Sequence, residues 1–113
     1  MWYKRAKDFS KRNRLHYKIN YLENLSKEIN DLKDMVFQSG TVTKREIEKI
    51  IYDNKISSYP KIRDMIIDMH SNILDSPSNF KAKAIILSNE IQKLIDTIKK
   101  GDQQDEDKKG WID

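Results

Sequence analysis

The clearest pattern in the chain is a row of apolar residues that recur every three or four positions from residue 15 to residue 36. The row consists of Leu15, Ile19, Leu22, Leu25, Ile29, Leu32 and Val36. This spacing places all of them on one face of an α-helix. The pattern stops at Gln38-Ser39-Gly40, where the glycine is suited to a left-handed helix cap. The sequence therefore predicts a long amphipathic helix that ends just before Gly40.

A second row of the same kind extends from residue 80 to residue 98. It consists of Phe80, Ala84, Leu87, Ile91, Leu94 and Ile98. The basic pair Lys99-Lys100 followed by Gly101 is typical of a helix C-terminus, because cations suit that end of the helix dipole and glycine accepts the cap conformation. The residues after Gly101 are polar and show no period, so we expect a flexible tail there.

Two shorter helices are predicted between these rows. Thr43 followed by Glu46 has the spacing of a capping box, which predicts a helix start at Thr43. The apolar residues that follow are Ile47, Ile50 and Ile51. After a polar break, Ser57-Ser58-Tyr59-Pro60 predicts the start of a third helix, because serine caps well and proline is tolerated in a first turn. The apolar face of this helix consists of Ile62, Met65, Ile66, Met69 and Ile73.

These segments predict an all-α fold, a small antiparallel helical bundle of about four helices with a long first helix and a flexible acidic C-terminal tail. We expect a basic N-terminal arm or helix overhang over residues 1–14, the helical bundle over 15–100 and a disordered acidic tail over 101–113. Short connections make the first and fourth helices antiparallel neighbours. The row over 15–36 also keeps a seven-residue repeat, so a homodimer seam is the alternative to an intramolecular core.

The charge of the chain is distributed unevenly. The whole chain carries +4, and the first 18 residues carry seven basic side chains against one acidic, a net charge of +6. Residues 101–113 carry two lysines against five acidic side chains, a net charge of −3. Such an asymmetry bears on binding partners more than on the fold.

The basic N-terminal segment is the best candidate for a functional surface. The residues that we expect to contact a partner or nucleic acid are Trp2, Lys4, Arg5, Lys7, Phe9, Lys11, Arg12, Arg14 and Lys18. Cations attract phosphate backbones, and the interleaved aromatic rings, Tyr17 among them, could stack on unpaired bases. Trp2, Ala6 and Phe9 form only a narrow apolar face, so binding to a membrane surface would be weak. A solvated helix end is the third alternative.

Residues that could carry catalysis are scarce. The only histidines are His16 and His70, cysteine is absent, and no zinc-protease, phosphate-loop or serine-hydrolase motif occurs. We therefore expect no enzyme, no cofactor and no metal. No apolar run approaches the roughly 18 residues that would span a bilayer, and we expect a cytoplasmic protein.

Two weaker hypotheses concern other segments. Residues 43–70 have the outline of a helix-turn-helix that could bind DNA, but Asp64 and Asp68 follow Lys61 and Arg63 and would face phosphates badly. In the acidic tail, Trp111 and Ile112 form an apolar pair that could dock on a partner. The sequence thus predicts a non-enzymatic protein-interaction or scaffold module that uses its basic head, with a nucleic-acid-associated protein as the alternative.

Overall fold

The structure is a computed structural model that describes the backbone of residues 2–112 and the side chains of residues 14–101. Its helices are α1 (Trp2–Met35), α2 (Gly40–Ile51), the short 3-10 helix η1 (Asn54–Ser58), α3 (Pro60–His70) and α4 (Pro77–Ile112). No strand occurs in the described backbone. The all-α prediction is therefore confirmed.

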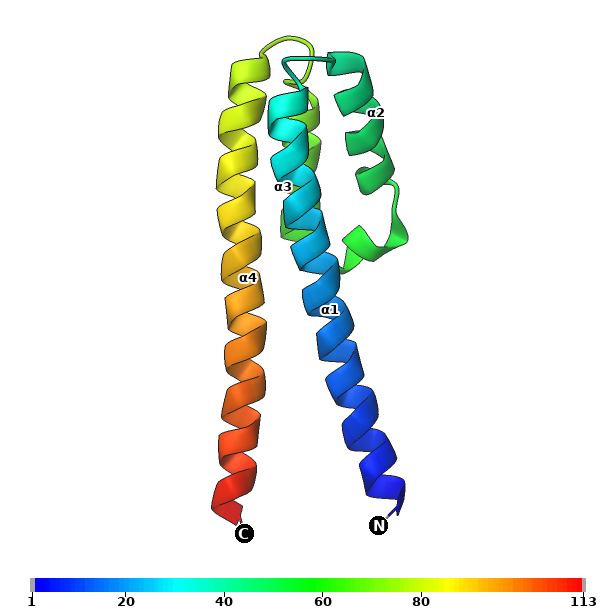
Figure 1. Ribbon diagram of the computed structural model, residues 1–113, viewed down its shortest axis with the longest axis vertical. Helices are drawn as coiled ribbons and strands as arrows, with labels where there is room; N and C mark the ends of the chain where they lie inside the picture. Colours follow the sequence, from blue (N-terminus) through cyan, green and yellow to red (C-terminus); the bar gives the residue numbers. More distant parts are fainter. Residues whose placement is uncertain (1, 113) are drawn as a thin grey trace.

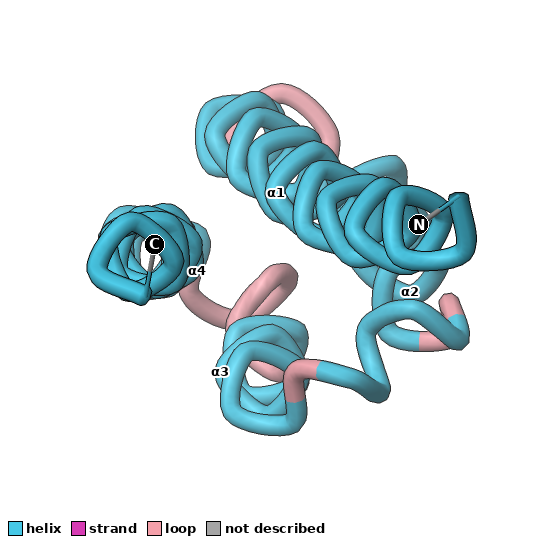
Figure 2. The backbone as a smooth tube through the Cα atoms, turned by 90° about the horizontal axis from the view of Figure 1, so that it is seen from below, coloured by secondary structure: helices cyan, strands magenta, loops and turns pink. Residues whose placement is uncertain are grey.

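The helices run up, down, up and down along one long axis (Figure 1). The helical region measures 58 Å along that axis and 22 and 20 Å across it. Helix α1 packs most extensively on α4, and α3 packs on α4 and on α2. Figure 2, a view along the axis, shows the four helices around a common centre, with α2 partly hidden behind the N-terminal part of α1. The predicted antiparallel pairing of the first and fourth helices is confirmed.

The core confirms the apolar row of α1. Leu22 and Ile29 are completely buried, while Leu15 and Ile19 are only half-buried. In α4 the buried row passes from Ile91 to Ile95, whereas the predicted core positions Leu94 and Ile98 remain half-buried. Four residues make slightly more than one helical turn, so a row with this spacing gradually rotates around the helix. In the lower part of α4, Ile95 therefore faces the core in place of Leu94.

The start of α2 differs from the prediction. The N-cap is Ser39, whose Oγ accepts a hydrogen bond of 3.2 Å from the backbone N–H of Val42. Gly40 is the first residue of the helix, and no described glycine has a positive φ, so the left-handed cap is absent there. Thr43 is buried one turn later and donates from Oγ1 to the Ser39 carbonyl over 2.9 Å. The predicted capping box of Thr43 and Glu46 is thus wrong.

The predicted break between α2 and α3 is a structured turn. The Asp53 side chain accepts a hydrogen bond of 3.0 Å from the Lys55 backbone N–H and caps η1. Ile56 of η1 is buried in the core, which anchors the turn. Pro60 begins α3 as predicted, but its N-cap is Tyr59, which makes no side-chain cap hydrogen bond.

The two long helices extend beyond the rest of the bundle. α2 and α3 end at the level of η1, and below it α1 and α4 continue as two separate arms (Figure 1). We call residues 2–20 of α1 and 99–112 of α4 the fork. At 1.5 Å per residue, the α1 arm projects by about 28 Å from Tyr21. The helix end expected at Gly101 is not observed, because α4 continues to Ile112. The side chains of residues 102–113 lie outside the described part of the structure. The flexibility expected of residues 101–113 therefore stays a prediction.

Candidate binding surface at the base of the fork

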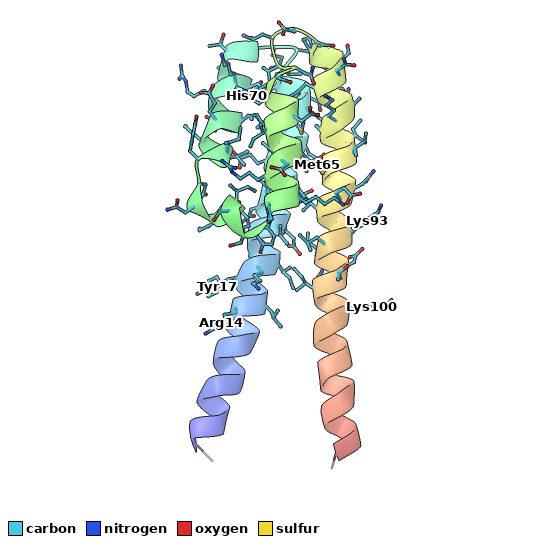
Figure 3. The ribbon with its side chains drawn as sticks, turned by 180° about the vertical axis from the view of Figure 1, so that it is seen from behind. Arg14, Tyr17, Met65, His70, Lys93 and Lys100 are labelled. Carbon is cyan, nitrogen blue, oxygen red and sulfur yellow. The ribbon has the colours of Figure 1, made fainter. Side chains whose placement is uncertain are left out.

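Most of the predicted contact residues lie in the α1 arm, and their side chains are outside the described part of the structure. These are Trp2, Lys4, Arg5, Lys7, Phe9, Lys11 and Arg12. Trp111 and Ile112 of the tail are likewise outside it. The structure does place Arg14 and Lys18, which lie one helical turn apart on α1 and are both exposed. Figure 3 shows Arg14 and Tyr17 on the part of α1 just below η1.

A pair of stacked tyrosines marks the point where the fork leaves the bundle. The rings of Tyr21 on α1 and Tyr59 before α3 have centroids 5.8 Å apart and planes inclined by 16°. Both rings are half-buried. Tyr59 is held in position because Ile56 is buried just before it and Pro60 begins α3 just after it. The pair fixes the base of the α1 arm against η1 and α3.

Both tyrosine hydroxyls of the pair keep their protons. Burial raises the pKa of Tyr21 to about 12, and the negative charge of Asp53, the neighbouring Tyr59 and Glu28 act in the same direction. Burial also raises the pKa of Tyr59. At neutral pH the two rings are therefore uncharged and can donate hydrogen bonds.

An open groove lies on the α1 side of this pair, and we call it the tyrosine groove. It has a volume of about 320 Å³ and is lined by Tyr17, Lys18, Tyr21, Lys55, Ser58 and Tyr59. Tyr17 is 71% exposed and presents its ring to solvent. Among the described residues the lining holds two lysines and no carboxylate. The groove thus combines exposed aromatic surface with positive charge.

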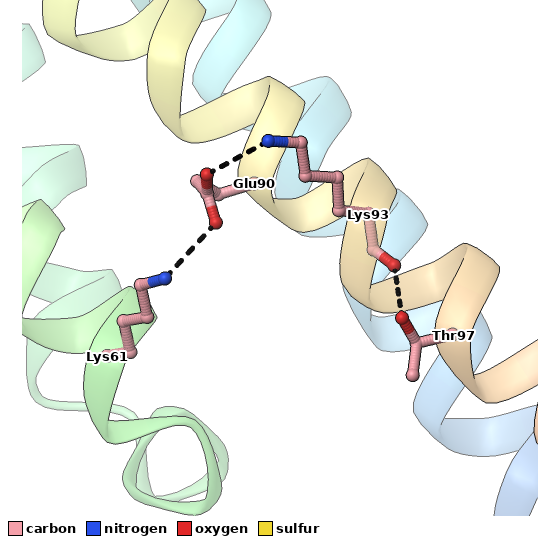
Figure 4. Close-up of polar contacts among 4 residues, drawn as sticks. All are labelled: Lys61, Glu90, Lys93 and Thr97. Carbon is pink, nitrogen blue, oxygen red and sulfur yellow. Dashed lines mark hydrogen bonds and ion pairs between the residues drawn. The ribbon is translucent and has the colours of Figure 1, made fainter.

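A second groove lies on the other side of Tyr59, between α3 and α4. It has a volume of about 370 Å³, and its walls include Ile62 and Leu94. Figure 4 shows its polar rim, where Glu90 lies 3.3 Å from the Lys61 ammonium and 3.5 Å from that of Lys93. The hydrogen bond and charge of Lys61, with the charge of Lys93, lower the pKa of Glu90. This acid offsets much of the positive charge around the second groove.

The sequence pattern points to only part of this surface. Lys18 is among the predicted contact residues, and Tyr17 is one of the aromatic residues interleaved with the cations. Tyr21, Lys55 and Tyr59 were missed, because Tyr59 lies 38 positions from Tyr21 in the sequence and only the fold brings the rings together. The polar break with its unusual Ser-Ser-Tyr-Pro run is the one sequence signal that points to this turn.

The helix-turn-helix hypothesis for residues 43–70 gains no support from the placement of its basic residues. Lys61 is paired with Glu90, and Arg63 is half-buried. His70 lies at the other end of α3, where its Nε2 is 3.1 Å from Glu48 Oε1 of α2. The DNA-binding alternative for this segment stays a prediction.

The described residues offer neither a metal site nor a membrane span. In that part of the chain, no group of three or more His, Asp or Glu side chains is arranged to hold a metal ion. His16 contacts only the Asn20 amide among the described polar groups, over 3.2 Å. Within the same limits, none of the helices has an apolar stretch long enough to cross a membrane.

Comparisons with known proteins identify no relative of this chain. Neither family models, nor curated proteins, nor solved structures give a match to this chain.

Proposed function

We propose that this protein is a non-enzymatic helical interaction module that binds an anionic partner through the basic arm of α1, residues 1–18. The bundle acts as a scaffold that holds the arm clear of the remaining helices. The expected compartment is the cytoplasm. The partner is defined by its negative charge, which complements that of the arm.

The observation that carries this proposal is the position of the charge relative to the fork. Residues 21–98, which form the packed bundle, contain 11 basic and 12 acidic side chains, a net charge of −1. The α1 arm, residues 2–20, contains seven basic side chains and one acidic, a net charge of +6, whereas the α4 arm, residues 99–112, contains four of each and is neutral. The excess positive charge therefore belongs to the α1 arm, which projects from the bundle.

The exposed side chains at the base of the arm support the same view. Arg14 and Lys18 are exposed, and Tyr17 between them is 71% exposed. At this level α2 no longer accompanies α1, so this face of the helix is free of the packing that covers Leu22 and Ile29. A basic and aromatic face with such access suits a protein or nucleic-acid partner that is rich in carboxylates or phosphates.

Retention on immobilised heparin tests the proposal with a defined polyanion. Two variants each remove four positive charges and so have the same net charge. The arm variant replaces Lys4, Arg5, Arg12 and Arg14 with Gln, and the body variant replaces Lys27, Lys33, Arg45 and Lys49 with Gln. We expect the arm variant to elute at clearly lower salt than the body variant, because only the arm concentrates the charge. Equal elution of the two variants would overturn the proposal.

Nucleic-acid association is the second candidate function. It is favoured by one observation, the exposed ring of Tyr17 beside the Lys18 ammonium in the tyrosine groove. Aromatic rings and cations in alternation are the means by which proteins hold unpaired bases and their phosphates.

A further inference from the structure

We infer that the tyrosine groove binds single-stranded nucleic acid, with bases stacked on its tyrosine rings and phosphates on Lys18 and Lys55. The inference rests on the proposed function, because the groove adjoins the basic arm of α1, and it deepens that function by naming the class of partner. It adds to the arm a site built from two separate parts of the chain.

The aromatic surface is the first argument. Tyr17 precedes Tyr21 by four residues, so the two side chains lie one turn apart on the same side of α1. Tyr21 is itself stacked on Tyr59, and Tyr17 adds a third, more exposed ring to the lining of the same groove. Every nucleobase has a flat face, so stacking on such a surface requires no particular sequence.

The charge of the groove is the second argument. Lys18 comes from α1 and Lys55 from η1, so the two basic residues line the groove from different elements. No carboxylate residue lines the groove itself, and the negative charges that act on Tyr21 come from Asp53 and Glu28 outside the lining. The tyrosine hydroxyls of the stacked pair are neutral at physiological pH and place no negative charge opposite a phosphate. The groove is thus complementary to a phosphodiester backbone.

The combination of tyrosine rings and lysines in the groove favours a single strand over other polyanions. A duplex hides the faces of its bases in the stack, so it offers phosphates to the lysines and nothing to the tyrosine rings. A polyglutamate peptide offers carboxylates but no flat aromatic faces. A volume of about 320 Å³ suits a short stretch of strand, which can then continue along the basic arm of α1.

The second groove provides an internal comparison. It is slightly larger, at about 370 Å³, and Tyr59 lines it as well. However, Glu90 occupies its rim and pairs with both Lys61 and Lys93. A phosphate there would meet a carboxylate, so the observations favour the tyrosine groove.

Fluorescence anisotropy of the full-length protein with a labelled oligothymidylate of about 12 nucleotides tests the inference. We expect Tyr17→Ala to weaken binding by at least about fivefold, because stacking is removed while the charge is kept. The matched control is Tyr52→Ala, which removes a ring that is 81% exposed at the end of α2 and should leave binding unchanged. Since Tyr17 is exposed, its replacement should leave the helical circular dichroism and the melting temperature as they are.

The lysines are tested by the dependence of binding on salt. The double variant Lys18→Gln/Lys55→Gln should reduce the slope of log affinity against log salt by about 1.4, because each lysine that neutralises a phosphate of a single strand accounts for about 0.7. The control is Lys27→Gln, since Lys27 is exposed and lies nine residues from Lys18, on the opposite side of α1. An unchanged slope in the double variant would count against the inference.

Three outcomes overturn the groove and leave the proposed function standing. In the first, the oligonucleotide binds, the arm variant abolishes binding, and the groove variants bind like wild type. In the second, a polyglutamate peptide of equal charge competes as well as the oligonucleotide and shows the same weakening with Tyr17→Ala. Absence of any oligonucleotide binding, together with normal heparin retention, also sinks the inference alone. Equal elution of the arm variant and the body variant from heparin would overturn the proposed function itself.

Discussion

The ring of Tyr21 lies stacked on the ring of Tyr59, with 5.8 Å between their centroids. One belongs to the first helix and the other to the residue that precedes the third, so the contact joins two distant parts of the chain. Tyr59 lies directly between η1 and α3, so the contact joins α1 to this turn. The stability of the bundle and the position of the binding surface therefore depend on the same pair of residues.

Removal of this stacked pair should destabilise the fold. We expect Tyr59→Ala to lower the free energy of unfolding by about 1–3 kcal/mol, because an aromatic pair adds to the burial of its rings. Tyr59→Phe keeps the stacked ring and should cost less. Urea denaturation followed by circular dichroism measures both, with the exposed Tyr52→Ala as the reference. A Tyr59→Ala variant as stable as Tyr52→Ala would contradict the structure at this point.

The register of the core in α4 can be tested by two neighbouring substitutions. Ile95 is 1% exposed, whereas Leu94 beside it is half-buried at the edge of the second groove. Ile95→Ala should cost about 2–5 kcal/mol, the usual range for an aliphatic side chain removed from a packed core. Leu94→Ala should cost clearly less. The reverse order in thermal or urea unfolding would mean that the row ending at Leu94 and Ile98 faces the core after all.

Gly40 begins α2 at a close approach between the two turns at the end opposite the fork. A Cβ atom at this position would lie 3.0 Å from Cδ2 of Leu74. Leu74 is 61% exposed, so its side chain can move aside. Because alanine is the better helix former, we expect Gly40→Ala to raise the free energy of unfolding by up to about 1 kcal/mol. A decrease of stability in denaturant titrations would instead show that the two turns are locked together.

The stability of the protein should decrease at high pH because of Tyr21. Its pKa is about 12 in the folded protein, against an ordinary value of 10.0. A pKa raised by folding means that the folded state holds the proton more tightly, so this contribution is complete below pH 10 and is lost as the pH rises towards 12. Tyr21→Phe should flatten the decrease over that range. Tyrosinate absorbance measures the pKa of Tyr21, and unfolding curves at the same pH values measure the stability. An equal loss of stability in wild type and in Tyr21→Phe would contradict the prediction.

The helical pattern could be predicted well from sequence because apolar periodicity is a local property. The rows through Leu22 and Ile91 needed no knowledge of partners to be recognised. The helix starts were less predictable, since Ser39 and Thr43 both resemble caps and only the packing of Thr43 into the core decides between them. The tyrosine groove could not be predicted from the sequence. Its walls come from residues 17–21 and 55–59, and the apolar periodicity gives no information on how these two segments pack together.

The placement of the α1–α2 turn and the α3–α4 turn at one end of the bundle has a mechanical consequence. Figure 1 shows the first turn of α1 and the last turn of α4 at the opposite end, as the two tips of the fork. A force applied between the ends would separate α1 from α4 from the fork upwards, breaking their contacts one after another. An early contact in its path would be the ion pair of Glu23 with Lys99, at 3.8 Å, and the core row would follow. Under tension the protein should therefore unfold by sequential separation of α1 from α4. The force needed should be well below the force that shears the same helices along their length.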